Sequence, residues 1–223
     1  IVFIWLAWVL ILIGFQALAT MRFAPAWPDR AQEWTTTETG PKYQQNRLFL
    51  LEPFMNNQVA WDSEYYLGIA VGGYDDPAAA VATDPNGKDW VKNYSFFPAY
   101  PYLIKAFMLP LGVFGLNPIA TASLAGVIVA LLGTLAGMIA LWDMTREYFD
   151  ENDSLRAVFY MLIFPSSFFF AQIYTEGLFV GLAFGSLALL KRKHWLWAAV
   201  LAFFAAWTRA HGVLLALPLG IAW

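Results

Sequence analysis

The sequence has no cysteine, only two histidines and little charge. The absence of cysteine excludes disulfides, thiolate metal ligands and a cysteine nucleophile. Charged residues make up 13% of the 223 residues and hydrophobic residues 60%, whereas soluble domains average about 25% and about 45–50%. A soluble domain of this size cannot bury so much apolar surface, and a net charge of −3 provides no basic footprint for nucleic acid. The composition therefore predicts a polytopic membrane protein.

Motifs of soluble enzymes are missing as well. The sequence contains no glycine-rich phosphate loop, no histidine pair at metal-ligand spacing and no serine-centred nucleophile elbow. A nucleotide-driven soluble mechanism therefore has no support in the sequence.

Long apolar runs predict the membrane spans. The first covers residues 1–19, where Gln16 is the only strongly polar residue, and about 20 apolar residues cross a ~30 Å hydrocarbon core. The alternative is a cleaved signal peptide, but the run is too long for a usual h-region and has no basic n-region. A second span is expected over residues 118–142, where Gly133-x-x-x-Gly137 offers a surface for close packing of another helix.

The remaining apolar sequence predicts three further spans, about five in all. A charged connector, residues 143–156, precedes an apolar stretch, residues 157–190, that is too long for one helix. Pro165 breaks this stretch because proline lacks an amide donor and disfavours helix before it. We expect two short helices that meet between Pro165 and Thr175, and a final span over residues 195–219 at least.

The predicted fold class is an all-α polytopic membrane helix bundle in a single domain, residues 1–223. It divides into a first span (1–19), an external loop (20–117) and the remaining spans (118–223). The sequence begins at Ile1 rather than methionine and ends within an apolar run, so we expect it to be part of a longer protein whose C-terminal part is missing.

The distribution of lysine and arginine predicts the orientation. The cluster Lys191-Arg192-Lys193 is expected on the cytoplasmic side. Counting spans backwards places the connector 143–156 inside, and the turn near Pro165 and the loop 20–117 outside. Residues 22–118 hold 17 of the 29 charged residues, and a loop of this length between spans usually carries function.

Asp62 begins an amphipathic helix predicted over residues 61–69. On that helix Asp62, Tyr65, Tyr66 and Ile69 share a face, while Glu64 points elsewhere. The carboxylate of Asp62 either caps the helix or is held at the membrane surface as a general base.

Glu176 and Arg209 lie in segments that are otherwise apolar. Glu176 opens a helix, a position that the helix dipole favours, and acids at membrane depth usually line a cavity. Arg209 lies about 14 residues into the last predicted span, or about 21 Å along its axis. It either snorkels to the interface or faces an external cavity and holds a lipid-linked phosphate. His211 points to a different face, and we favour a packed, neutral histidine there over a binding residue.

Four motifs follow one another along most of the chain. They are Trp61-Asp62-Ser63-Glu64-Tyr65-Tyr66-Leu67-x-Ile69-Ala70-x-x-Gly73-Tyr74; Phe96-Phe97-Pro98-x-Tyr100-Pro101; Phe164-Pro165-x-Ser167-x-Phe169 with Tyr174-x-Glu176-x-Leu178-Phe179; and Thr208-Arg209-x-x-Gly212. In this order they resemble the signatures of the PIG-V-type mannosyltransferases, a family of GT-C membrane glycosyltransferases. Ala99 and Ala210-His211 depart from the family pattern.

The resemblance implies an inverting glycosyltransferase that moves a sugar, typically mannose, from a polyprenyl-phosphate donor to an acceptor hydroxyl on the external or lumenal face. Asp62 corresponds to the family's first-loop aspartate and is the predicted general base. Arg209 is predicted to stabilise the leaving phosphate, with Tyr174 and Tyr100 as helpers. Glu176 is predicted to orient acceptor hydroxyls or to share the role of base.

The remaining predicted binding residues surround these groups. Trp61 and Tyr65 are expected to stack on sugar faces, and Glu64 and His211 complete the predicted binding set. We predict no metal and no cofactor, since a polyprenyl-phosphate donor already carries an activated sugar. The expected partners are that donor, a glycan or glycolipid acceptor and membrane lipids, without nucleic acid. The compact loops favour a bacterial plasma membrane over the endoplasmic reticulum.

Two other functions stay open on the sequence. In a transporter or flippase subunit for lipid-linked sugars, Asp62, Glu176 and Arg209 line a substrate path; this predicts an inverted repeat, and no matching pair of broken helices is evident. In a non-catalytic structural subunit, the charged residues of the loop are replaceable without loss of product.

Overall fold

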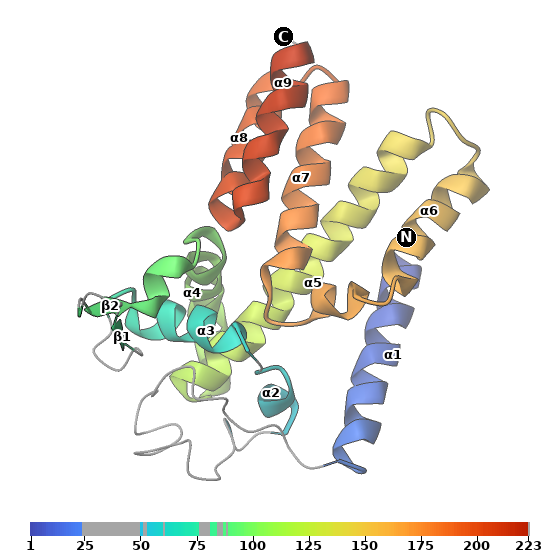
Figure 1. Cartoon of the computed structure of the whole chain (residues 1–223). Helices are drawn as coiled ribbons and strands as arrows, with labels where there is room; N and C mark the ends of the chain where they lie inside the picture. The colour runs from blue at the N-terminus through green and yellow to red at the C-terminus, as the bar shows by residue number, and fades with distance from the viewer. Residues whose placement is uncertain are drawn as a thin grey trace. The chain divides into compact units, whose positions relative to one another are not determined.

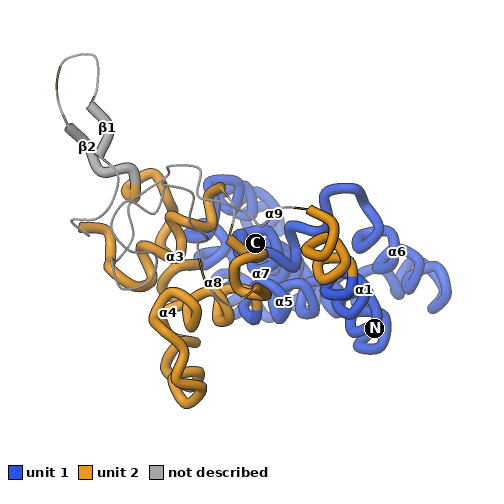
Figure 2. Tube along the Cα trace, turned by 90° about the horizontal axis from the view of Figure 1, so that it is seen from below, with its two compact units in different colours: residues 1–14, 128–223 blue, residues 15–127 orange. Residues whose placement is uncertain are grey.

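A computed structural model describes residues 1–23, 50, 53–59, 61–75, 81–83, 87 and 89–222. The chain divides into two compact units (Figure 2). Unit 1 comprises Ile1–Gly14 and Ile128–Trp223, and unit 2 comprises Phe15–Val127. Much of the polar first part of the predicted loop, residues 24–49, lies outside the described residues.

Helices dominate the described residues (Figure 1). The α-helices are α1 (Val2–Thr20), α2 (Pro53–Asn57), α3 (Ser63–Gly72), α4 (Ala99–Leu111), α5 (Pro118–Thr145), α6 (Glu151–Ile163), α7 (Thr175–Lys191), α8 (Trp195–Thr208) and α9 (Ala216–Ala222). The 3-10 helices are η1 (Lys92–Ser95), η2 (Gly112–Phe114), η3 (Ser167–Ala171) and η4 (Ala210–Leu215). The strands β1 (Val81–Thr83) and β2 (Asp89–Val91) form an antiparallel pair with Val81 opposite Val91. The all-α prediction is thus confirmed, and this short hairpin lies within the predicted external loop.

Among the described helices, α1 and α5 are the two that are long and apolar enough to cross a membrane. They match the first and second predicted spans, and the total of five spans stays a prediction. Within unit 1, the indole Nε1 of Trp5 donates to the carbonyl of Leu131, and that of Trp8 to the carbonyl of Leu162, each at 3.1 Å. These bonds integrate α1 into the packed unit, which favours an anchor over a cleaved signal peptide.

Glycines bring α5 and α7 into backbone contact. A Cβ atom built at Gly133 would lie 2.6 Å from the carbonyl oxygen of Gly177, and one at Gly181 would lie 3.0 Å from the carbonyl carbon of Gly133. The hydroxyl of Thr134 donates to the carbonyl of Phe170 at 2.8 Å across the same contact. The predicted packing surface on α5 is confirmed, and its partner is a second small-residue pair on α7, Gly177-x-x-x-Gly181.

Gly177→Ala is expected to destabilise unit 1. The new methyl group would lie 2.7 Å from the hydroxyl oxygen of Thr134 and would also overlap backbone atoms, and such overpacking costs about 1–3 kcal/mol. The thermal midpoint of the purified protein in lipid should fall by several degrees. Gly14→Ala is the matched control because a Cβ at Gly14 meets nothing within 4 Å; equal midpoints for the two variants would contradict the contact.

The stretch 157–190 divides near the predicted place. α6 ends at Ile163, Phe164 is extended with φ −60° and ψ 138°, and α7 begins at Thr175. The predicted charged connector is shorter than expected because α6 already begins at Glu151. Asp150 caps this helix by accepting a hydrogen bond from the amide of Asp153 at 2.8 Å, a strong local start signal.

The predicted continuous span over residues 195–219 is wrong. α8 ends at Thr208, Arg209 is extended with φ −154° and ψ 148°, and the chain then reverses. η4 and α9 return along α8 and α7 (Figure 1). Gly212 allows this return, since a Cβ there would overlap the backbone of Ala205. The apolar run continues through the turn and therefore conceals it in the sequence.

In unit 2, polar side chains tie α2 to the end of α1. The amide Nε2 of Gln58 donates to Oε1 of Gln16 at 2.9 Å, and Nδ2 of Asn57 donates to the hydroxyl of Thr20 at 2.7 Å. The one strongly polar residue of the first span thus has a structural partner, as buried polar groups usually do.

Candidate active site

The third and fourth motifs meet in unit 1 through an ion pair. Nη1 of Arg209, at the end of α8, donates to Oε1 of Glu176, in the first turn of α7. The same nitrogen lies 3.3 Å from the hydroxyl oxygen of Thr175. The side chain of Arg209 is 34% exposed and that of Glu176 27% exposed. The two residues lie 33 positions apart, so sequence inspection found no acid near Arg209.

The ion pair leaves hydrogen-bonding capacity on both partners. Among the described residues, Arg209 bonds through Nη1, and a guanidinium carries five N–H donors. Oε2 of Glu176 is buried and accepts no hydrogen bond from the described part of the chain. The helix N-terminus stabilises the carboxylate. The pair therefore presents a positioned cation beside a buried acceptor.

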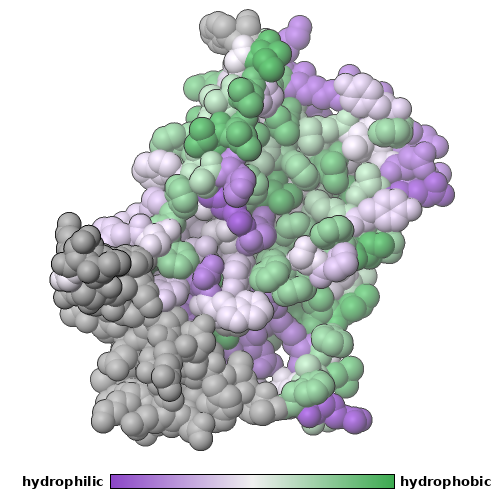
Figure 3. Space-filling model, in the orientation of Figure 1, coloured by the Kyte–Doolittle hydropathy of each residue, from purple (hydrophilic) through white to green (hydrophobic). Residues whose placement is uncertain are grey.

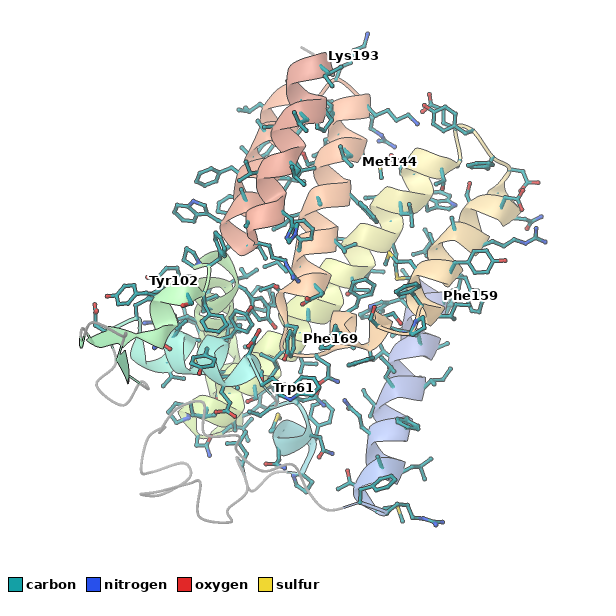
Figure 4. The ribbon with its side chains drawn as sticks, viewed as in Figure 1. Trp61, Tyr102, Met144, Phe159, Phe169 and Lys193 are labelled. Carbon is teal, nitrogen blue, oxygen red and sulfur yellow. The ribbon has the colours of Figure 1, made fainter. Side chains whose placement is uncertain are left out.

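Two other predicted residues flank the ion pair in the sequence. Tyr174 precedes α7 with an extended backbone, and its ring packs edge-on against Phe169 with 4.9 Å between centroids. Figure 4 shows Phe169 near the start of α7. His211 is exposed in η4, so the favoured prediction of a packed, neutral histidine is wrong. The reversal of the chain after Arg209, absent from the predicted span, turns this residue outward.

Asp62 in unit 2 stands at the N-cap position of α3. Its side chain makes no capping hydrogen bond and is exposed, so the capping interpretation lacks its defining bond. Tyr66 and Ile69, which are predicted to share a helix face with Asp62, are buried. Trp61 is 60% exposed and has a left-handed φ of 51°. Such a conformation is uncommon outside glycine and clusters at functional sites.

Glu64 and Tyr65 follow within the first turn of α3. Glu64 is completely buried, and the helix N-terminus favours its charge. The ring of Tyr65 stacks on Phe96 with 4.6 Å between centroids and 17° between planes. One face of Tyr65 is therefore already covered by an aromatic ring of the second motif.

Tyr100 of the second motif lies in the core of unit 2. It is fully buried, and its hydroxyl donates to the carbonyl of Gly126 at 3.0 Å. Its ring packs edge-on against Tyr66, with 5.2 Å between centroids. The first and second motifs thus pack together through α3 and α4; Figure 4 labels Tyr102 on α4 and Trp61, which precedes α3.

Tyr74, the last residue of the first motif, also contacts the second. Its hydroxyl donates to the carbonyl of Phe96 at 2.8 Å. Burial, aided by the nearby phenol of Tyr102, raises the pKa of Tyr74 to about 12. The hydroxyl therefore remains a protonated donor at neutral pH and anchors the end of the motif.

Contacts within unit 1 also test the predicted sidedness. Asp143 and Glu147 pair with Arg192 and Lys191, so the connector and the basic cluster share one end of the unit. Glu176 and Arg209 share the opposite end of α7. The predicted grouping of these segments is confirmed, and their assignment to a face of the membrane stays a prediction. In the described ranges, no group of three or more His, Cys, Asp or Glu residues is arranged to hold a metal.

The order and pairing of the four motifs lead to a comparison with known proteins. A family model described as Mannosyltransferase (PIG-V) matches residues 41–217. The chain belongs to this family. The PIG-V resemblance inferred from the motifs is therefore confirmed.

Two mammalian proteins are among the relatives of this PIG-V family chain. GPI alpha-1,6-mannosyltransferase 2 of Homo sapiens is 27% identical over 170 residues, which cover 74% of this chain and 31% of the relative. The Mus musculus protein of the same name is 29% identical over 170 residues, which again cover 74% of this chain and 31% of the relative. The chain thus spans about a third of the length of these relatives. No solved structure matches it.

Proposed function

We propose that this PIG-V family protein transfers mannose from a polyprenyl-phosphate donor to an acceptor hydroxyl, with inversion at the anomeric carbon. The family supports mannosyl transfer. The observation that carries the proposal is the ion pair of Arg209 and Glu176 at a break between α8 and η4. A partly exposed guanidinium with unused donors suits a phosphate, which it can bind through two parallel hydrogen bonds.

The proposed reaction has one displacement step. The acceptor oxygen forms a bond to the anomeric carbon as the bond from that carbon to the phosphate oxygen breaks. The acceptor proton passes to the carboxylate of Asp62. This residue is exposed in the turn that precedes α3. The leaving phosphate gains negative charge, and the donors of Arg209 stabilise that charge as it develops.

Glu176 acts in this proposal as a positioning residue. Its Oε1 accepts a hydrogen bond from Arg209 and so fixes where the guanidinium can meet the phosphate. The buried Oε2 can accept a hydrogen bond from an acceptor hydroxyl, as the sequence predicted.

Some of the remaining predicted residues are proposed to contact the substrate, and others to support those that do. Trp61, Tyr174 and His211 are at least partly exposed and are proposed to contact the sugar or the lipid phosphate. Tyr65 is proposed to stack on a sugar beside its contact with Phe96. The buried Tyr100 and Glu64 hold α3 in place and act on the substrate through that helix.

The acceptor and location are also proposals. The relatives' name specifies an alpha-1,6 mannosyl transfer in GPI, and we propose a glycan or glycolipid acceptor for this chain. We place the reaction on the external face, and the compact loops favour a bacterial plasma membrane.

The donor assay tests the function. Purified protein in lipid vesicles is given an acceptor glycolipid and radiolabelled mannose, either on polyprenyl phosphate or on GDP. Label should reach the acceptor only from the lipid-linked donor, and EDTA should leave the rate unchanged because no metal takes part. Transfer from GDP-mannose would contradict the donor. Movement of the lipid-linked sugar across the vesicle membrane without product would favour the flippase alternative.

A further inference from the structure

A charged cavity lies at the end of α7 opposite the Glu176–Arg209 pair. Its volume is about 330 Å³, near the lower end of the range for small-molecule sites, which is about 300–1,000 Å³. The residues that line it are Asp143, Arg146, Glu147, Lys191 and Arg192. Figure 4 marks this end of unit 1 by Met144 and Lys193, and Figure 3 shows hydrophilic side chains gathered around the neighbouring turn between α5 and α6.

The cations of the cavity exceed its acids. The carboxylate of Asp143 forms ion pairs with Nη2 of Arg146, at 3.1 Å, and with Nη2 of Arg192. Lys191 pairs with Glu147 and also donates to the carbonyl of Met144 at 3.0 Å. Three cations face two carboxylates, so the lining has a net charge of +1. Ion pairing among these five residues therefore leaves one positive charge without a matching carboxylate.

Both arginines have donors left for a ligand. Within the described residues, the ion pairs of Arg146 and Arg192 use one terminal nitrogen of each guanidinium, whereas each group carries five donors. Their side chains are 47% and 54% exposed. Arg146 directly follows α5 and Arg192 directly follows α7, so an anion bound to both would bridge the ends of the two helices.

Aromatic side chains surround this end of the unit. The guanidinium of Arg146 lies 4.4 Å from the ring centroid of Trp142, and Nζ of Lys191 lies 4.1 Å from that of Tyr148. Tyr148 and Trp197 are largely exposed. Tryptophan and tyrosine concentrate at the level of the lipid headgroups, where basic pockets between helices bind anionic headgroups.

We propose that this cavity binds the headgroup phosphate of an anionic phospholipid, with Arg146 and Arg192 as its principal ligands. A freely dissolved anion shares the phosphate chemistry but gains nothing from the aromatic surroundings. The site is separate from mannosyl transfer and does not depend on the proposed function. A bound headgroup would link the ends of α5 and α7. Elsewhere along their length these two helices touch at the paired glycines.

Lipid affinity tests the proposal directly. The purified protein is placed in nanodiscs of phosphatidylcholine alone or mixed with phosphatidylglycerol, and bound phosphatidylglycerol is counted by native mass spectrometry over a titration. Arg146→Gln and Arg192→Gln should each weaken binding about tenfold, the scale of one lost charge-assisted hydrogen bond. Arg156→Gln is the matched control, since Arg156 pairs with Asp153 on the exposed side of α6, and it should bind as the native protein does.

A variant with the opposite sign guards against loss of folding. Asp143→Asn frees both arginines from their shared carboxylate, so it should strengthen phosphatidylglycerol binding. Native affinity in both arginine variants, or unchanged or weaker binding in Asp143→Asn, would overturn the site. Inorganic phosphate added to the mixed nanodiscs should not displace phosphatidylglycerol at millimolar concentration; effective displacement would identify a site for a soluble anion and overturn the lipid.

Discussion

Arg209→Gln is expected to lower kcat for mannosyl transfer by about 100- to 1,000-fold, the usual cost of removing one group that stabilises transition-state charge. The glutamine keeps a hydrogen-bond donor but removes the positive charge beside the leaving phosphate. KM for the lipid-linked donor should change less than kcat, because the charge on the phosphate rises as the bond breaks. Steady-state kinetics with polyprenyl-phosphate mannose measure both constants.

Controls must separate chemistry from folding in this experiment. Arg209→Gln leaves Glu176 without its cation, and a stranded carboxylate destabilises a protein. Rates are therefore expressed per folded molecule, and the neutral pair Glu176→Gln with Arg209→Gln provides a second measurement. Arg156→Gln removes an exposed arginine of the same unit and should keep full activity. A kcat for Arg209→Gln within twofold of native would remove Arg209 from the reaction.

The ion pair itself predicts a smaller effect for Glu176. Glu176→Gln should lower kcat about tenfold, because a charge-assisted hydrogen bond contributes about 1.5–3 kcal/mol. If Glu176 acts by positioning Arg209, its loss should cost little once Arg209 is already glutamine. Additive losses in the double variant would instead give Glu176 an independent role, as a base or an acceptor ligand.

Asp62→Asn is expected to lower kcat by about 100- to 10,000-fold, the range attributed to a general base. Asparagine has nearly the same shape but cannot take the acceptor proton. The carboxylate is exposed at the start of α3, and the thermal midpoint of the variant separates a loss of chemistry from a loss of folding. The pH profile should also lose its acidic limb, which reports the protonation of the base.

Asp75→Asn is the matched control for this prediction. Asp75 is an exposed acid in the same unit, and it accepts a hydrogen bond from the hydroxyl of Tyr94. Removing its charge should leave transfer unchanged. Full activity in Asp62→Asn would eliminate the assigned base, while equal losses in both variants would point to a general effect of charge in unit 2.

Hydropathy and proline predicted the helices well where local sequence determines them. α1, α5 and the break near Pro165 follow from apolar length and from a missing amide donor. The reversal at Arg209 did not show, because the residues on both sides of the turn are equally apolar. Gly212 is a local sign of this turn. It is needed because its backbone lies against that of Ala205, a tertiary contact that the sequence does not reveal.

The sequence singled out individual residues of the candidate site, but it did not predict which of them pair with one another. Charged residues in apolar surroundings singled out Glu176 and Arg209 because such placement costs free energy. Their ion pair depends on α8 ending beside the start of α7, which is a tertiary event. Asp62 stands at the N-cap of α3, close to the helix start that the sequence predicts. The burial of Glu64 depends on its packing in unit 2.

The glycine contact between α5 and α7 has a consequence for bilayers of different thickness. Gly177 adjoins Glu176 and sits where helix backbones touch, so the start of α7 cannot slide along its neighbour without steric overlap. In the predicted membrane arrangement, adjustment to a thinner or thicker membrane would then occur through tilt or at the lysine-bearing end of α7. The height of the Glu176 carboxylate relative to α5 should stay constant as the host lipid changes.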